Sequence, residues 1–413
     1  MWSNWSGNQQ CSAPVLQPKG AAEIAAAIRS ADCVRPVGTG HSFTPLVPGA
    51  GAVIAPQPDG DPVRVVEGSR VWLDANAPLH VLSEALAAKG LAFRNLGDIN
   101  VQTLAGASST ATHGTGATLP CLAAEITGAR LVDGTGEVQD VSAEDLPGVQ
   151  VALGLLGVLT EVEMEVVPAY NLRRRTAIKP AEELIGQMED RWASHRNYEF
   201  FLLPHAGRGV GISHDVTEDV PGKPPMDLDE LGVAYLKATR HLKAWPGLRR
   251  GAIGLLAAVM SDEDYVGESW KVLSSTRRTR FNEMEYHLPP EVARDVLDEI
   301  EGLLARKHRD VWFPIEVRRT AGDTAWLSPF QGGGRVSVAV HMAAGQDYVA
   351  YFRDCEAVFR AAGGRPHWGK LHGLKRANLE ALYPDLGKFD ALRARFDPKD
   401  RFMSPALAEL FAR

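Results

Sequence analysis

Short apolar runs separated by Gly and Pro dominate the first part of the chain and predict short strands with a few helices. An Ala-rich stretch over 21–31 places Ile24 and Ile28 four positions apart on one face, which predicts a helix. An apolar strand over 33–37 and a glycine-rich loop follow it. The other elements expected here are strands over 63–67 and 71–75, a helix from Leu79 that stops at Gly90, and a hairpin over 131–138.

The pattern changes after about residue 168. Strand-like runs alternate with helical ones, and this order favours an α+β sheet that helices cover on one face. A stretch rich in Pro and acidic residues, 217–229, is expected to be a flexible loop. The elements predicted in this part are strands over 198–203, 281–286, 311–318 and 336–342, a helix that carries Val292, Val296 and Ile300, and a helix around Phe352.

Composition narrows the class of protein. A chain of 413 residues exceeds the usual size of one hydrophobic core, so two domains are expected. The formal net charge of -7, without a dense run of Lys or Arg, argues against nucleic acid as a partner. The four Cys are far apart and form no CxxC pair, so we expect no metal site. We see no signal peptide and no apolar run that could span a membrane, which favours a cytoplasmic protein.

A glycine loop over 38–43 follows the strand predicted at 33–37 and is the first candidate site. Closely spaced glycines let backbone N–H groups approach a phosphate. The dinucleotide fingerprint GxGxxG needs a third glycine where Phe43 stands, which disfavours a nicotinamide-dependent dehydrogenase. The alternative for this loop is an ordinary turn.

The stretch 104–116 consists almost entirely of small and hydroxylated residues, which give little with which to build a core. Backbone amides and hydroxyls of this kind suit the lining of a large polar ligand. The alternative is a long solvent loop, and the apolar runs on either side of the stretch weaken it.

Glu316 and Arg318 are two positions apart in the predicted strand 311–318, so both side chains project from the same face. The apolar run over 311–315 implies a strand that is at least half buried. A buried Glu and Arg side by side suit hydrogen bonding to a polyhydroxylated substrate. The alternative is an exposed ion pair that contributes little.

These segments occur in one order with Gly154–Thr160 and Pro366–Lys370. Together they resemble the vanillyl-alcohol oxidase superfamily of FAD enzymes, and within it the aldonolactone and alditol oxidase group. The likeness extends from Asn4–Asn8 to Phe396–Pro398 and so covers nearly the whole chain.

The resemblance implies an α+β fold, in which a two-part FAD-binding domain of the vanillyl-alcohol oxidase type carries an inserted α+β cap domain for the substrate. The corresponding ranges are 1–168 for the FAD-binding domain, 169–382 for the cap and 383–413 for the C-terminal return. It also implies FAD joined covalently through His41, with a non-covalent loop histidine as the alternative. The implied cofactor-binding residues are Gly38, Thr39, Gly40, His41, Ser42, Phe43, Gly97, Gly106, Ala107, Ser109, Thr110, Thr112, His113, Gly114, Gly157, Val158, His367 and Lys370.

Catalytic roles follow from the same resemblance. Lys370 would stabilise the developing alkoxide while hydride leaves the substrate carbon for the flavin, with Glu316 and Arg318 above the flavin. Gly97 would leave a passage for oxygen, whereas alanine at that position is associated with lactone dehydrogenases. The implied substrate-binding residues are Asp98, Glu316, Arg318, His341, Lys370 and His372.

Two departures bear on the substrate. Asp98 stands where alditol oxidases carry serine and Ala343 where they carry threonine, while Phe281–Tyr286 is more similar to lactone oxidases. The expectation is therefore a monomeric or homodimeric oxidase of an L-gulono-, L-galactono- or D-arabinono-1,4-lactone, reoxidised by O2 to give H2O2. The alternatives are an alditol or other polyol oxidase and a lactone dehydrogenase with another acceptor. A flavin-binding protein without turnover is disfavoured, because Glu316, Arg318 and Lys370 are all present.

Overall fold

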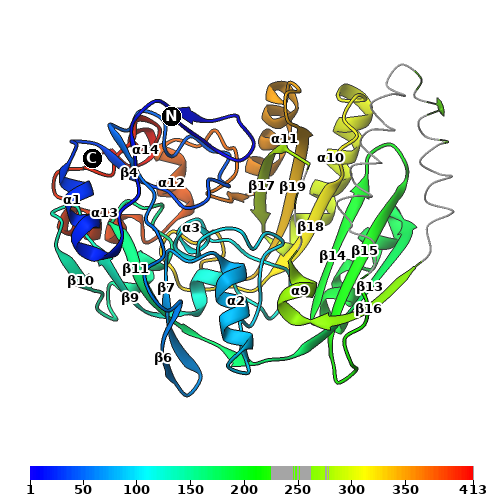
Figure 1. Cartoon of the computed structure of the whole chain (residues 1–413). Helices are drawn as coiled ribbons and strands as arrows, with labels where there is room; N and C mark the ends of the chain where they lie inside the picture. Colours follow the sequence, from blue (N-terminus) through cyan, green and yellow to red (C-terminus); the bar gives the residue numbers. More distant parts are fainter. Residues whose placement is uncertain are drawn as a thin grey trace.

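The chain builds two sheet regions side by side, and Figure 1 shows both of its ends in one region and its middle in the other. The structure is a computed structural model, and it describes residues 1–224, 262–274, 277 and 279–412, together with 245, 247, 248 and 251.

The first region contains a parallel sheet and an antiparallel sheet, and helix α1 (Gly20–Arg29) packs against both of them. Ile24 and Ile28 of α1 are buried against the parallel sheet and against Val132 and Val158 of the antiparallel one, as the four-residue spacing predicts. The parallel sheet has the order β3 (Val15–Leu16), β5 (Ala52–Ile54), β4 (Val34–Pro36). The antiparallel sheet has the order β10 (Val138–Asp140), β9 (Ile126–Val132), β11 (Val158–Glu165), β7 (Arg70–Asp74), β6 (Val63–Glu67).

Shorter elements complete this region. The helices are α2 (Leu79–Ala87), α3 (Leu104–Ser109), the 3-10 helix η1 (Leu122–Glu125) and α4 (Leu146–Gln150), and the two-stranded pairs are β1 (Trp2–Ser3) with β2 (Gln10–Cys11) and β8 (Leu91–Ala92) with β12 (Val167–Pro168). The C-terminal helices α12 (Arg376–Leu382), α13 (Leu386–Phe396) and α14 (Pro405–Phe411) return to the same core, where Phe389 and Phe411 are fully buried.

Arg35 of β4 ties the two ends of the chain together. Its guanidinium donates to the carbonyls of Phe402 (2.7 Å), Leu153 (2.5 Å) and Gly154 (3.1 Å), and the residue is 1% exposed. The neighbouring N–H of Val34 donates to the carbonyl of Arg401 at 2.7 Å. The first sheet is therefore completed by residues from the far end of the sequence.

The second region is one antiparallel sheet with helices on one side (Figure 1). Its strand order is β16 (Glu263–Glu268), β13 (Asn171–Pro180), β15 (Arg208–Thr217), β14 (Asn197–Leu203), β18 (Ile315–Thr320), β19 (Arg335–Ala343), β17 (Phe281–Leu288), β20 (Arg365–Pro366). The helices on that side are α5 (Ala181–Gly186), α6 (Met188–Ser194), the 3-10 helix η2 (Pro290–Val292), α10 (Ala293–Lys307) and α11 (Val349–Ala361). Helix α9 (Ser269–Leu273) instead buries Val272 and Leu273 in the core of the first region.

The two faces of this sheet differ in character. One face is apolar, and Val317 and Val338 pack there against Ile300 of α10 and Phe359 of α11. The other face carries charged side chains that are buried nonetheless, among them Glu316 and the register partners Glu199 and Arg318. Burying charges costs free energy unless they are paired, so these side chains need partners within the protein or a ligand.

The α+β fold class is confirmed, and most of the predicted elements lie where the sequence indicates. The predicted strand 311–318 is an exception, because the strand begins only at Ile315. Pro314 has no N–H to donate to a neighbouring strand, and this excludes it from the ladder. Of the predicted loop 217–229, residues 218–224 form no helix or strand, and 225–229 lie outside the described residues. The domain boundaries at 168 and 382 stay a prediction.

Within the described part of the chain, no helix is long and apolar enough to span a membrane.

Candidate active site

A hollow of about 900 Å³, counted with its open mouth, lies in the first region and is lined by three segments far apart in sequence. They are the glycine loop at 38–42, helix α3 with its N-cap Thr103, and the stretch 153–159. Ten of the residues expected to bind the cofactor line it, namely Gly38, Thr39, Gly40, His41, Ser42, Gly106, Ser109, Thr110, Gly157 and Val158.

The glycines of this hollow let backbone groups form its wall. Gly40 has φ +74° and Gly157 has φ +153°, conformations that side chains with a Cβ rarely adopt. A Cβ on Gly38 would collide with Thr103 Oγ1, and one on Gly157 would lie 2.5 Å from the carbonyl oxygen of Val132. A narrow cradle of backbone amides and hydroxyls fits the phosphates and sugar of a dinucleotide such as FAD.

Several lining residues were not predicted. Thr103 caps α3 by accepting from the N–H of Gly106 at 3.2 Å, and an N-cap before a run of small residues is a signal the sequence does contain. Asn76 and Gln102 also line the hollow, but each is an isolated polar residue and gives no comparable signal.

His41 lies in the middle of the glycine loop 38–43. Its ring is stacked on Trp5 with centroids 5.6 Å apart, and its Nδ1 lies 3.1 Å from Thr39 Oγ1. Burial and then the charge of Lys370 lower the pKa of His41 to about 4. The imidazole is therefore neutral at physiological pH, the form in which a ring nitrogen is a nucleophile.

The remaining expected cofactor positions lie outside the lining of the hollow. Phe43 connects the glycine loop to the segment around Lys370, because its N–H donates to the Gly369 carbonyl (2.7 Å) and its ring lies 5.2 Å from Lys370 Nζ. Ala107 is part of α3, and its side chain is fully buried in the hydrophobic core. The others outside the lining are Gly97, Thr112, His113, Gly114, His367 and Lys370.

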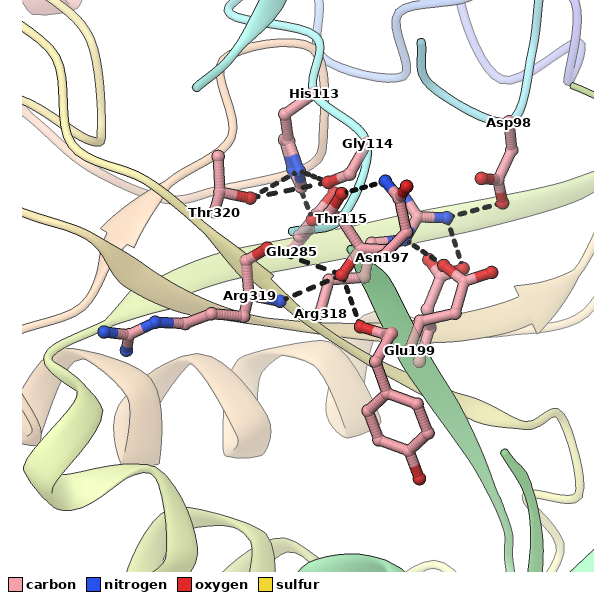
Figure 2. A network of polar contacts seen from close by, with 12 residues as sticks. Asp98, His113, Gly114, Thr115, Asn197, Glu199, Glu285, Arg318, Arg319 and Thr320 are labelled. Atoms are coloured by element: carbon pink, nitrogen blue, oxygen red, sulfur yellow. Dashed lines mark hydrogen bonds and ion pairs between the residues drawn. The ribbon is translucent and has the colours of Figure 1, made fainter. Parts of the chain in front are cut away.

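Arg318 is the centre of one charged cluster on the polar face of the sheet, and Figure 2 shows the carboxylates that surround it. Its Nε donates to Glu199 Oε2 at 2.9 Å, and its Nη2 donates to Asp98 Oδ2 and Glu316 Oε1, each at 2.5 Å. Arg277 donates to the same oxygen of Asp98 at 3.0 Å. Glu199 and Arg277 were not predicted as site residues.

The single positive charge of Arg318 cannot balance the negative charges of three ionised carboxylates. Burial and the neighbouring Asp98 raise the pKa of Glu199 to about 8, despite the opposing effect of Arg318. Burial also favours the neutral form of Asp98, but Arg318 and Arg277 outweigh it and lower the pKa of Asp98. Glu199 therefore keeps its proton at neutral pH, while Asp98 is the charged partner of the arginines.

Lys370 belongs to a second charged cluster. Its ammonium donates to Glu283 Oε2 and lies 3.9 Å from Glu285 Oε2, and both acids are almost fully buried on β17. Burial tends to raise the pKa of Glu283, but Lys370 and His341 outweigh it and hold that pKa at about 2. Glu283 and Glu285 were also absent from the predicted set.

His113 joins the stretch 104–116 to this second cluster. Its Nε2 lies 3.0 Å from Glu285 Oε1 and its Nδ1 lies 2.8 Å from the Gly114 carbonyl oxygen (Figure 2). The rings of His287 and His367 lie 5.0 and 5.7 Å from that of His113. The small-residue stretch therefore contacts both the cofactor hollow and the polar face of the sheet.

His341 and His372, both expected to bind substrate, lie in different surroundings. His341 Nε2 is 3.5 Å from Glu283 Oε1, so His341 faces the Lys370 cluster. His372 lies edge-on to the buried Trp368 at 5.8 Å, and burial lowers its pKa to about 4, with Glu356 as the opposing charge. The structure brings together five of the six expected substrate residues, namely Asp98, Glu316, Arg318, His341 and Lys370.

Gly97 is close-packed as well as small. A Cβ at this position would lie 3.0 Å from the carbonyl oxygen of His113 and 3.1 Å from Thr112 Cγ2. Its own carbonyl accepts from Ser274 Oγ at 3.2 Å.

Among the residues that the structure describes, three groups of acids and histidines have ligand-type atoms within 4.8 Å of one another, the spacing that a metal ion needs. In two of them a side chain of the protein already balances the acids, since Lys370 pairs with Glu283 and Arg318 pairs with Glu316. In the third, Glu285 pairs with His113. Charged donors and acceptors paired in this way fit the hydroxyl groups of a substrate better than a cation.

Comparisons with known proteins found relatives that align over nearly the whole chain. Residues 162–410 match the family model of D-arabinono-1,4-lactone oxidase, and residues 12–142 match an FAD binding domain. An L-gulono-1,4-lactone dehydrogenase from Mycobacterium tuberculosis is 32% identical, over 98% of this chain and 97% of that protein. An alditol oxidase from a Streptomyces species is 28% identical, over 99% of this chain and 98% of that protein. The crystal structure of a cholesterol oxidase from Brevibacterium sterolicum shares the fold, with a TM-score of 0.81 at 17% identity over 99% of this chain and 96% of that one.

Proposed function

The chain belongs to the D-arabinono-1,4-lactone oxidase family of FAD-dependent enzymes that act on CH–OH donors, and from this premise we propose that it oxidises a sugar 1,4-lactone. The proposed substrates are lactones of the L-gulono, L-galactono or D-arabinono type, and the proposed acceptor of the electrons is O2.

The observation that carries this proposal is the pair of charged clusters on one buried sheet face, next to the cofactor hollow. Lys370 and Arg318 present hydrogen-bond donors there, and Glu283 and Glu316 present acceptors. Phe43, at the end of the glycine loop, contacts Lys370 directly. A polyhydroxylated ring needs several donors and acceptors of this kind in a space from which water is excluded.

FAD, when bound, supplies the acceptor for the two electrons that leave the substrate carbon as hydride. In this proposal Lys370 stabilises the negative charge that develops on the substrate oxygen, because a preorganised cation in a dry site acts on the transition state. Arg318 and Glu316 hold the other oxygens of the ring, and Asp98 keeps Arg318 in place by accepting from it at 2.5 Å.

His41 is proposed to bind FAD covalently. Its neutral ring at physiological pH and its fixed stacking on Trp5 support that role. Precipitation of the purified protein with acid tests it: the flavin stays with the pellet if the bond exists and passes into the supernatant if it does not. His41→Ala is the matched control, in which the colour should leave the protein.

The presence of Asp98 supports a lactone rather than an alditol as the substrate. Alditol oxidases carry a serine at the matching position, whereas here a carboxylate is fixed between Arg318 and Arg277. A peroxide assay across sugar 1,4-lactones and alditols decides between them. Turnover of alditols alone would contradict the lactone proposal, and turnover with a dye but not with oxygen would make the protein a dehydrogenase.

A further inference from the structure

Oxidation of a carbinol releases the hydroxyl proton as well as a hydride. As the C–H bond breaks with its electron pair passing to FAD, the O–H bond breaks as well and a C=O double bond forms. The hydroxyl proton therefore needs a base in the site. This inference rests on the proposed function, because it takes the substrate to be an alcohol bound next to Lys370.

Two obvious acceptors are already committed to other partners. Lys370 Nζ donates to Glu283, and Glu285 Oε2 is only 3.9 Å away. Glu316 Oε1 is engaged by Arg318 at 2.5 Å, although burial raises the pKa of the Glu316 carboxyl despite the opposing effect of Arg318.

His341 faces the same charged groups through its Nε2. Its Nδ1 lies 3.0 Å from the carbonyl oxygen of Pro314, which can only accept, so the proton of the neutral ring is on Nδ1. In the neutral ring Nε2 therefore carries the lone pair, and once protonated it faces Glu283 Oε1, 3.5 Å away, as an ion-pair partner.

The ring of His341 is also fixed in orientation. Phe313 is stacked on it with centroids 5.1 Å apart and an interplanar angle of 25°, and Phe281 meets it edge-on at 5.1 Å and 86°. The side chain is only 7% exposed. A flip that exchanged the two nitrogens would therefore require both aromatic rings to move and would break the bond to Pro314.

We propose that His341 Nε2 is the base that takes the substrate hydroxyl proton, and that Glu283 is its positioning residue. Glu283 faces His341 from the neighbouring strand, where the two are register partners, and Glu316 faces it from β18. Both carboxylates stabilise the imidazolium that forms. Lys370, bound to the other oxygen of Glu283, is the cation on the far side of that carboxylate.

The first test needs no turnover. Ring-nitrogen NMR of the oxidised holoenzyme, with ¹⁵N-labelled histidine and without substrate, reports the tautomer and titration of each ring. The His341 signals are those that disappear in His341→Gln. We expect a proton on Nδ1 and none on Nε2 above the titration midpoint, and in Glu283→Gln a midpoint lower by about 1–3 pH units. A proton on Nε2 instead, or a midpoint unmoved by Glu283→Gln, would overturn the proposal even if lactones are oxidised.

The second test is the pH profile of anaerobic flavin reduction by substrate. Wild type should lose rate at acidic pH, and His341→Gln should be slower by roughly 100- to 10,000-fold and lack the acidic limb. His308→Gln is the matched control, since His308 pairs with Asp354 in the helical layer on the other face of the sheet, and it should keep the limb. Should Glu316→Gln abolish the limb while His341→Gln retains it, Glu316 is the base and this proposal fails. Absence of turnover with any lactone or alditol would instead contradict the proposed function, and the NMR result would still decide the state of His341.

Discussion

Lys370 compensates two buried carboxylates, so removing it should have two separable effects. Lys370→Met should slow anaerobic flavin reduction by about a hundredfold to a thousandfold, because a preorganised charged donor typically contributes about 3–4 kcal/mol to the transition state. The apparent affinity for the substrate should change modestly, since the charge develops only during hydride transfer. Rapid-mixing reduction separates the rate from the affinity.

The second effect is on stability, because Lys370→Met leaves Glu283 and Glu285 without their cation. The double variant Lys370→Met/Glu283→Gln is the control for it. It should recover free energy of unfolding relative to Lys370→Met and should not recover the rate. If Lys370→Met reduces its flavin at the wild-type rate, Lys370 has no part in the chemistry.

Gly97 leads to a prediction about the rate at which O2 reoxidises the reduced flavin. A methyl group there would press on the His113 carbonyl and on Thr112 Cγ2, so Gly97→Ala should slow reoxidation by O2 and leave anaerobic reduction largely intact. Stopped-flow mixing of the reduced enzyme with oxygenated buffer measures it. The double variant Gly97→Ala/Thr112→Ser removes the contact with Cγ2. Slow reoxidation that persists in the double variant assigns the effect to the methyl group itself, and equal reoxidation in wild type and Gly97→Ala places the gate elsewhere.

At the scale of a strand, side-chain alternation explains both what the sequence revealed and what it did not. The spacing of Glu316 and Arg318 correctly predicted a shared, half-buried face. The same rule applied to β17 would have put Glu283 and Glu285 on one face, so that signal was present and went unused. The contact of Glu199 with Arg318 is different, because it depends on β14 lying next to β18. No local pattern specifies which strands become neighbours.

Glu199 provides a prediction for this polar face as a whole. Its pKa in the folded state is about 8, whereas a glutamate in an unfolded chain has a pKa of about 4.3. Between these values the folded protein holds a proton that the unfolded chain has released, so the stability contributed by Glu199 is complete at low pH and is lost as pH rises through about 8.

Glu199→Gln removes that titration and keeps the shape of the side chain. The free energy of unfolding, measured in urea from pH 5 to 9, should fall more steeply with pH in wild type than in the variant. Glu199→Ala is the control that also removes the hydrogen bond to Arg318 and should be less stable at every pH. Parallel curves for wild type and Glu199→Gln would mean that Glu199 is already ionised at neutral pH.

At the scale of the whole molecule, the architecture follows from family resemblance more than from local pattern. Propensity and alternation place individual helices and strands, but the hollow combines the glycine loop, α3 and the stretch 153–159, which only the tertiary fold brings together. Local pattern also does not predict that α13 and α14 return to the first core, because an apolar residue such as Phe389 does not indicate which sheet it will cover.

Substitution of Arg35 tests how much the contacts between distant parts of the chain contribute to stability and to the hollow. Arg35→Met would leave the carbonyls of Leu153, Gly154 and Phe402 without their donor, which should lower the free energy of unfolding by about 2–4 kcal/mol. Because Leu153 and Gly154 line the hollow, the flavin content of the purified protein should fall as well. Urea unfolding and the ratio of flavin to protein absorbance measure the two effects.

Arg401→Met is the matched control, since Arg401 donates to the Ala31 carbonyl at 2.8 Å, and Ala31 does not line the hollow. It should cost stability without changing the flavin content. Full flavin content in Arg35→Met would show that the hollow keeps its shape without this anchor.

The hydrogen bond between Arg35 and Phe402 can form only late in the synthesis of the chain. The two residues are 367 positions apart. At about 5–20 residues per second, the ribosome adds the later one roughly 20–70 s after the earlier one. During that interval the edge of β4 lacks the partner that Arg401 will supply. We therefore expect flavin to bind the released polypeptide rather than the nascent one, so that chains that terminate early stay colourless.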